Sequence, residues 1–152
     1  MRRAIFARFS RRAVLALTMP LIAGMGVLAV PAAHADDLGG ADHLLCASLT
    51  ATRCTPDGCT TDRPTAWNIP QFIEIDLAHK VLKTTVASGQ NRSTPIRTLI
   101  RENGQIVIQG FENGRAFSFV IDEASGDLNA AIATPAGSNV VFAACTPMPA
   151  GR

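Results

Sequence analysis

Two identical tripeptides, ten residues apart, constrain this chain more than any other feature. They are Glu102-Asn103-Gly104 and Glu112-Asn113-Gly114. Asn-Gly is the preferred pair for a type I′ turn, which joins two antiparallel strands through a two-residue loop. The sequence therefore predicts two successive β-hairpins that share the strand between the turns, residues 105–111.

The strands beside the second turn alternate with the two-residue period of a half-buried strand. Phe117, Phe119 and Ile121 share one face and are expected to point inward. On the preceding strand, Ile106 and Ile108 share a face with residue 110, a glycine. A glycine inside a strand marks a bulge or a bend, so we expect one there.

Short β-rich runs and turn signals alternate about every ten residues through the rest of the chain. The fold class predicted is all-β: an antiparallel meander of about eight strands that closes into an up-and-down barrel or half-barrel, because closure removes exposed edges. Small residues in the last two strands favour a filled interior. The expected strands are 43–53, 71–77, 80–87, 96–101, 105–111, 115–122, 127–133 and 139–145, with a crossover loop over 60–68 and an exposed loop over 88–95.

Four cysteines, Cys46, Cys54, Cys59 and Cys145, allow three pairings into two disulfides. The turn sequence Thr-Pro-Asp-Gly favours Cys54 with Cys59, because it brings the flanking strands within bridging distance. Cys46 then pairs with Cys145 and ties the first strand to the last. The alternative is a metal site in which His43 or His79 joins the thiols, but the cysteine spacing lacks the close pairs of common zinc sites.

Residues 1–35 have the pattern of a cleaved signal peptide. Five arginines precede an apolar run over residues 13–30, and Ala33-His34-Ala35 fits a small-x-small cleavage site. Ser10-Arg11-Arg12 resembles a twin-arginine signal, and a general secretory signal fits the segment as well. We therefore expect a single β domain over residues 36–152, periplasmic or secreted, with no membrane span in the mature form.

The charge balance disfavours a nucleic-acid partner. The chain has 14 basic and 12 acidic residues, and removal of the five leader arginines leaves nine basic residues against the twelve acidic ones. A mildly acidic domain without basic clusters has no surface for phosphates.

No catalytic residue and no cofactor are predicted. The chain has no Gly-x-Ser-x-Gly elbow and no thiol free of expected pairing. Glu74 and Asp76 are interpreted as the wet outer face of a strand, and His43 and His79 as surface histidines. The rival hypothesis is a hydrolase or isomerase that uses His79 with Glu74 and Asp76.

Asp122, Ser125 and Asp127 surround Gly126 in one predicted turn. Their oxygens suit a calcium ion, but Asp and Ser side chains also cap turns by bonding backbone amides, and the plain turn is favoured. Trp67, the only tryptophan, lies between Pro64 and Pro70. It is interpreted as a cover over one barrel mouth, with contact to a ligand or protein partner as the alternative.

Four segments carry a resemblance: Cys54 to Cys59, Phe72 to Leu77, Gly114 to Asp122 and Phe142 to Cys145. Together they resemble uncharacterised exported bacterial proteins. The resemblance implies export and a β-rich domain, and it carries no activity, cofactor or catalytic residue. A looser likeness is to bacterial inhibitors of lysozyme, which are small exported eight-stranded barrels that bind a hydrolase through loops; their Ser-Gly-x-x-Tyr loop is missing, as the chain has no tyrosine.

The function predicted is a non-enzymatic binding module for an unknown small molecule or envelope protein. A small apolar molecule requires a cavity inside the barrel, lined by Phe117, Phe119, Ile121 and Ile106. A protein partner is expected to bind loops, including Trp67 and residues 88–95. Inhibition of a lysozyme-type hydrolase is the alternative function.

Overall fold

The computed structural model describes residues 37–149, which belong to one compact unit. The predicted signal peptide lies outside the described residues. Within residues 37–149, no helix is long and apolar enough to cross a membrane. The elements are β1 (His43–Thr55), β2 (Gly58–Asp62), η1 (Pro64–Trp67), β3 (Phe72–Asp76), β4 (Val81–Thr84), η2 (Val86–Ser88), β5 (Ser93–Pro95), β6 (Thr98–Glu102), β7 (Gln105–Glu112), β8 (Arg115–Asp122), β9 (Asp127–Thr134) and β10 (Gly137–Pro147).

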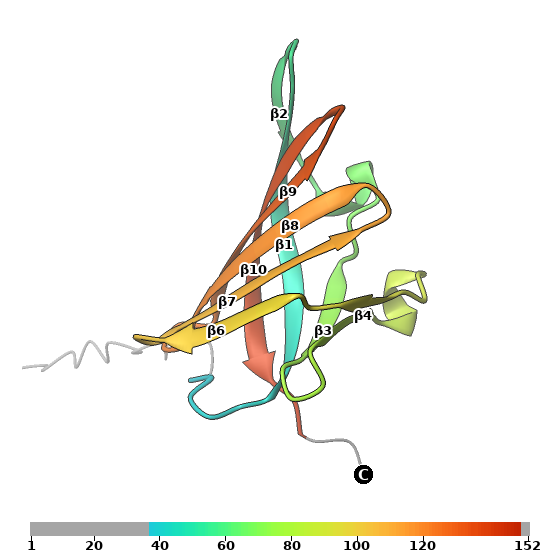
Figure 1. Cartoon of the computed structure of the whole chain (residues 1–152). Coiled ribbons are helices and arrows are strands. Elements are labelled where there is room, and N and C mark those ends of the chain that lie inside the picture. The colour runs from blue at the N-terminus through green and yellow to red at the C-terminus, as the bar shows by residue number, and fades with distance from the viewer. Residues whose placement is uncertain (1–36, 150–152) are drawn as a thin grey trace, which may run out of the picture. The chain divides into compact units, whose positions relative to one another are not determined.

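All ten strands belong to one antiparallel sheet, curved into a half-barrel (Figure 1). The strand order is β5-β4-β3-β1-β10-β9-β8-β7-β6, with β2 paired to β1 beside this path. The first and last strands therefore lie side by side. The predicted all-β fold and its disulfides are confirmed.

The two edge strands of the half-barrel follow each other directly in the chain. Only Ile96 and Arg97 separate β5 from β6. The backbone N–H of Ile96 donates to the carbonyl of Lys80 (2.8 Å), and that of Arg97 donates to the carbonyl of Gln109 (2.9 Å). This stretch thus changes its partner from β4 to β7. With β5 and β6 taken as one run and β2 left aside, the wall has the eight strands predicted.

The two Asn-Gly turns form as expected. Asn103 and Asn113 have φ values of 53° and 49°, in the left-handed region that a type I′ turn requires. Strand β8 has the bounds predicted for it, and its inner face buries Phe119 and Ile121 completely or nearly so. Phe117, nearer the turn, is half-buried and packs against the core.

Residue Gly110 is not a bulge, which corrects the expectation from the sequence. The pairing of β7 with β8 runs without a shift through Gly110 and its partner Phe117. A Cβ atom at this position would overlap the Phe117 ring. The glycine is explained by this cross-strand ring, which covers the backbone.

Strand β1 contains the irregularity that the sequence did not predict. Its register with β10 shifts between Ser48 and Thr50. On the other side, β1 pairs with β3 up to Ala47 and with β2 from Ala51 onward. Ser48 fills the gap, since its N–H donates to the carbonyl of Gln71 (2.8 Å). The bulge lies where β1 changes partners.

Two segments predicted as loops contain strands. Residues 58–62 form β2, which pairs with the outer half of β1. Residues 93–95 form β5, and Thr94 there is buried. The expected strand over 80–87 is shorter, because the chain turns into η2, where the Thr85 side chain accepts a hydrogen bond from the Ser88 N–H.

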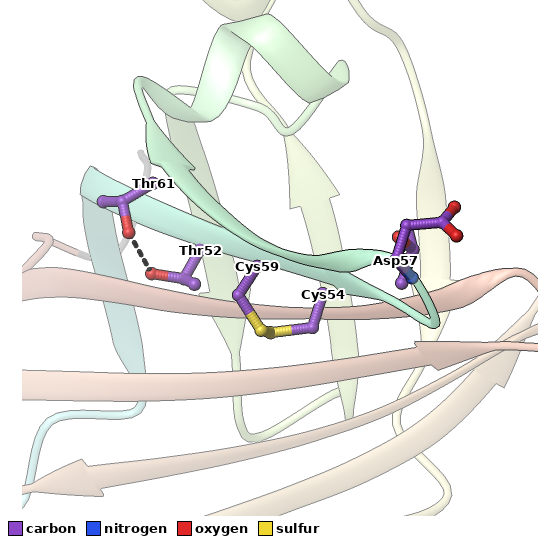
Figure 2. The surroundings of a disulfide bond; sticks show 6 residues. Thr52, Cys54, Asp57, Cys59 and Thr61 are labelled. Atoms are coloured by element: carbon purple, nitrogen blue, oxygen red, sulfur yellow. Dashed lines mark hydrogen bonds between the residues drawn. A yellow bond between two sulfur atoms is a disulfide. The ribbon is translucent and has the colours of Figure 1, made fainter.

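Both predicted disulfides form, and their surroundings differ. Cys46 and Cys145 face each other across β1 and β10 and belong to the buried core. Cys54 and Cys59 bridge the β1–β2 hairpin, which extends furthest at the top of Figure 1. All five residues of β2 are exposed. Figure 2 shows this bridge beside the Thr52–Thr61 hydroxyl contact of 2.8 Å.

Candidate functional site

The interior of the half-barrel contains a cavity of about 130 Å³. This finding corrects the expectation of a filled barrel. The small side chains of Ala130 and Ala143 both line the space, so they leave room where tight packing was expected. The alternating pattern of a strand shows which side chains point inward, but it does not show whether they meet.

Most of the cavity wall is apolar. Of the four side chains expected to line it, Phe117 and Phe119 do so, with ring centroids 5.3 Å apart. Ile106 and Ile121 are fully buried in the core and take no part in the wall. The other apolar lining residues are Cys46, Trp67, Ile69, Pro70, Ile73, Ile75, Leu82, Leu128, Ala130, Ile132, Val141 and Ala143.

Two arginines, one lysine (Lys83) and one glutamate contribute charge to the same cavity. Arg92 Nη1 lies 4.0 Å from Glu112 Oε2, and Arg115 Nη2 lies 3.9 Å from that same oxygen. Glu112 and Arg115 flank the Asn113-Gly114 turn, which brings them opposite each other. Both ion pairs are long, and one carboxylate faces two guanidinium groups. The group therefore carries an excess of positive charge.

Two buried polar atoms of the cavity residues have no hydrogen-bond partner among residues 37–149. They are Arg92 Nε and Asn139 Oδ1. A buried polar atom without a partner costs about 1–3 kcal/mol. Such a donor and acceptor at a cavity are groups that a bound polar molecule can satisfy.

Trp67 closes part of the cavity wall. It ends the short helix η1, is half-buried, and packs against the core. Asn68 follows it, and the Gln90 side-chain amide donates to Asn68 Oδ1 (2.8 Å). This hydrogen bond joins the two segments expected to contact a protein partner, the Trp67 segment and residues 88–95. Arg92 and Thr94 of the second segment also line the cavity.

A second group of polar side chains lies where β3 ends. Asp76 is 7% exposed, so its assignment to a wet outer face was wrong. Its carboxylate accepts hydrogen bonds from the His79 backbone N–H (2.9 Å) and from His79 Nδ1 (2.9 and 3.0 Å). His43, opposite it on β1, places Nε2 3.8 Å from Asp76 Oδ1. His79, from the turn after β3, and His43, from β1, together cover this carboxylate.

The surroundings of Asp76 change its acidity in opposite directions. Burial raises the pKa of the carboxyl group, whereas the His79 backbone bond, the His79 side chain and the nearby His43 lower it. The hydrogen bonds and charges together outweigh burial, so the pKa lies below its ordinary value and the carboxylate is ionised. Glu74, its expected partner, is half-exposed, and neither residue lines the cavity.

Turn bonds account for the acidic residues around Gly126. Asp122 Oδ1 accepts from the backbone N–H groups of Ala124 (3.1 Å) and Ser125 (2.9 Å). The Ser125 hydroxyl donates to Asp127 Oδ2 (3.0 Å). These side chains cap the turn, as the plain-turn interpretation predicts.

Sequence reasoning missed the charged residues of the cavity. A signal existed for Glu112 and Arg115, because the predicted hairpin turn already makes them cross-strand neighbours. Arg92 and Asn139 gave no such signal. Arg92 belongs to a segment without periodicity. Asn139 lies in β10 between the adjacent β9 and the distant β1, and no local pattern shows that its side-chain oxygen lacks a partner.

Comparison with protein-family models, with curated proteins and with solved structures finds no match to this chain. A function for the protein must therefore be inferred from the chemistry of its cavity and of the histidine–aspartate group.

Proposed function

We propose that this protein is a non-enzymatic binding module that holds a small amphipathic molecule, with an apolar body and an anionic group, inside its half-barrel. The observation that carries the proposal is the apolar cavity with two arginines in its wall. Ligand sites in proteins commonly combine apolar walls with a few polar groups that fix orientation. The proposal includes export to the periplasm or beyond, which the two disulfides support, since such bonds persist in oxidising compartments.

The size of the cavity limits the buried part of the ligand. A dry cavity of about 150 Å³ accommodates benzene. The space of about 130 Å³ here suits a single ring or a short acyl segment. Fully burying an apolar group of this size contributes about 1.5–3 kcal/mol.

The charged groups define the other end of the ligand. A carboxylate beside Arg92 and Arg115 would gain charge-assisted hydrogen bonds, and the Arg92 Nε atom would gain the acceptor it lacks. Glu112 already balances one of the two positive charges. Lys83 adds a further positive charge to the cavity wall, so an anionic group is the match in charge.

The first experiment measures binding of a single-ring carboxylate, phenylacetate, against its neutral amide. Trp67 is the only tryptophan in the chain and lines the cavity, so its emission reports occupancy directly. We expect saturable quenching by the acid and weaker binding of the amide. No emission change with either compound, together with no shift in melting temperature, would refute the proposal.

Two neighbouring alanines on β9 provide a matched pair of variants. Ala130 is buried and lines the cavity, whereas Ala131 is exposed on the other face of the strand. Leucine at position 130 fills the space, so Ala130→Leu should abolish binding, while Ala131→Leu should leave it unchanged. Arg92→Gln should weaken binding of the acid only, and Arg97→Gln, on an exposed residue, is its control.

A second candidate function rests on the β1–β2 hairpin. The hairpin extends from the sheet, its strand β2 is fully exposed, and Cys54–Cys59 braces it. A loop held in one conformation loses less entropy when it binds a partner. This supports a role as an inhibitor of a lysozyme-type hydrolase. The test is a lysozyme assay with the full chain and with a Cys54→Ala/Cys59→Ala variant; equal lysozyme rates with and without the chain would exclude it.

A further inference from the structure

The side chains of His43, Asp76 and His79 converge away from the cavity. His43 begins β1, Asp76 ends β3, and His79 lies in the turn before β4. Pairing of β1 with β3 sets His43 directly opposite Asp76. None of the three lines the cavity. This cluster is therefore a separate site from the proposed ligand cavity.

We propose that His43, Asp76 and His79 bind one divalent transition-metal ion, with Zn²⁺ as the best match. One ligand atom from each residue lies within 4.8 Å of the other two. His79 Nδ1 lies 2.9 Å from Asp76 Oδ2, and His43 Nε2 lies 3.8 Å from Asp76 Oδ1. Imidazole nitrogens together with one carboxylate oxygen form a common donor set for zinc.

The distances fit a shared metal ion after small side-chain movements. Zinc lies about 2.0–2.1 Å from its nitrogen and oxygen ligands, so two tetrahedral ligands are about 3.4 Å apart. The distance from His79 Nδ1 to Asp76 Oδ2 (2.9 Å) is shorter than that value, and the distance from His43 Nε2 to Asp76 Oδ1 (3.8 Å) is longer. The side chain of His79 is 78% exposed and that of His43 is 35% exposed. The His79 ring in particular therefore has room to rotate.

The carboxylate is the fixed member of the cluster. The His79 backbone N–H donates to Asp76 Oδ1 at 2.9 Å, and this bond orients the carboxylate independently of either imidazole. Hydrogen bonds of this kind to a ligating group commonly strengthen metal sites. The other carboxylate oxygen, Oδ2, and the two imidazole rings remain available to the ion, and water can occupy the fourth position.

Metal binding requires the His79 imidazole to change its tautomer. His79 Nδ1 contacts both carboxylate oxygens, so in the metal-free protein this nitrogen carries the proton that it donates. A neutral imidazole binds metal through the nitrogen that has no proton. The proton must therefore move from Nδ1 to Nε2. The His79 ring is exposed, so solvent can carry out this exchange at little cost.

The competing explanation is that Asp76 only holds the turn together. Its bond to the His79 backbone serves that purpose. It does not account for a second imidazole, from His43, on the same carboxylate. No cysteine among the described residues is free, so thiols do not compete for the ion.

The test uses the full chain without a histidine tag, after treatment with a chelator. Calorimetric titration with Zn²⁺ should give one ion per chain, and Co²⁺ should produce the visible absorption of a low-symmetry site. His79→Ala should lower Zn²⁺ affinity by about tenfold or more, since it removes one of three ligands. Asp76→Asn should do the same, while its amide oxygen can still accept the turn hydrogen bond.

His34 supplies the matched control, because it is the only other histidine in the chain. His34→Ala should bind Zn²⁺ as the unchanged chain does. The proposal is overturned if the chain takes up no Zn²⁺ at micromolar concentration, or if His79→Ala and Asp76→Asn bind as tightly as His34→Ala. Circular dichroism of each variant separates a lost ligand from a lost fold.

Discussion

A side chain from one strand can dictate the absence of a side chain on its neighbour, as Phe117 does at Gly110. The ring lies over the glycine, where a Cβ atom has no space. The same ring forms part of the cavity wall. Packing at this single position therefore connects the stability of the β7–β8 hairpin with the shape of the proposed binding site.

The substitution Gly110→Ala is expected to destabilise the protein by about 1–3 kcal/mol, because the methyl group forces the Phe117 ring to move. The backbone at this position is not in the left-handed region, so only the ring opposes the methyl group. Urea denaturation measures the loss. In a Phe117→Leu background the cost should shrink, and an equal cost in both backgrounds would contradict this explanation.

The Asp122 carboxylate predicts a pH effect. Its pKa is lowered, first by the hydrogen bond from the Ser125 backbone N–H. A group whose pKa is lowered by folding stabilises the fold above its unfolded pKa, roughly pH 4, and this contribution disappears as the pH falls through the folded value. Asp122→Ala should therefore lower the melting temperature at pH 7, and this difference should shrink as the pH falls below about 4. A difference that stays the same at every pH would show that the turn bonds act without the charge.

At the scale of elements, the β1–β2 hairpin and the β1–β10 pair carry the two disulfides in opposite environments. Cys46 and Cys145 are 1% and 2% exposed. Cys59 is exposed on the hairpin. Thiol–disulfide exchange needs direct attack on a sulfur atom, so access controls its rate.

Mild reduction of the native protein should therefore open Cys54–Cys59 first and leave Cys46–Cys145 intact. Alkylation followed by mass analysis of the peptides gives the order. The reverse order, or simultaneous loss of both bridges, would mean that the core opens as readily as the hairpin.

For the whole molecule, the Cys46–Cys145 bridge closes a loop with a sequence separation of 99 residues. The chain-entropy relation assigns about 4–5 kcal/mol to such a loop and about 2 kcal/mol to one of five residues. Removing the long bridge by Cys46→Ala/Cys145→Ala should cost about 2–3 kcal/mol more than Cys54→Ala/Cys59→Ala. Denaturation of both variants by urea tests this, and equal costs would contradict it.

Local patterns were sufficient for much of the fold. The Asn-Gly turns and the alternation from Arg115 to Asp122 predicted β8 with its bounds, and the Thr-Pro-Asp-Gly turn predicted the cysteine pairing. The bulge near Leu49 could not be predicted from the sequence. It arises because β1 changes its neighbour from β3 to β2, and no local pattern in β1 encodes where that happens.

The candidate sites were less predictable for the same reason. Asp76 alternates correctly with Ile75, yet it is buried by His79 from a turn and by His43 from another strand. The cavity depends on the distance between opposing strands of the half-barrel. The alternation of side chains along one strand does not determine that distance. Both features arise from contacts between distant segments.

At Ile96 and Arg97 the chain stops pairing with β4 and begins to pair with β7. The sheet is weakly connected at this point. Only three residue pairs join β5 to β4, whereas eight join β7 to β8. Separating β5 from β4 breaks few backbone hydrogen bonds, and the two strands remain covalently connected through the chain between them. The sheet is therefore expected to open first at β5, and amide hydrogens along β5 should exchange with solvent before those of β8.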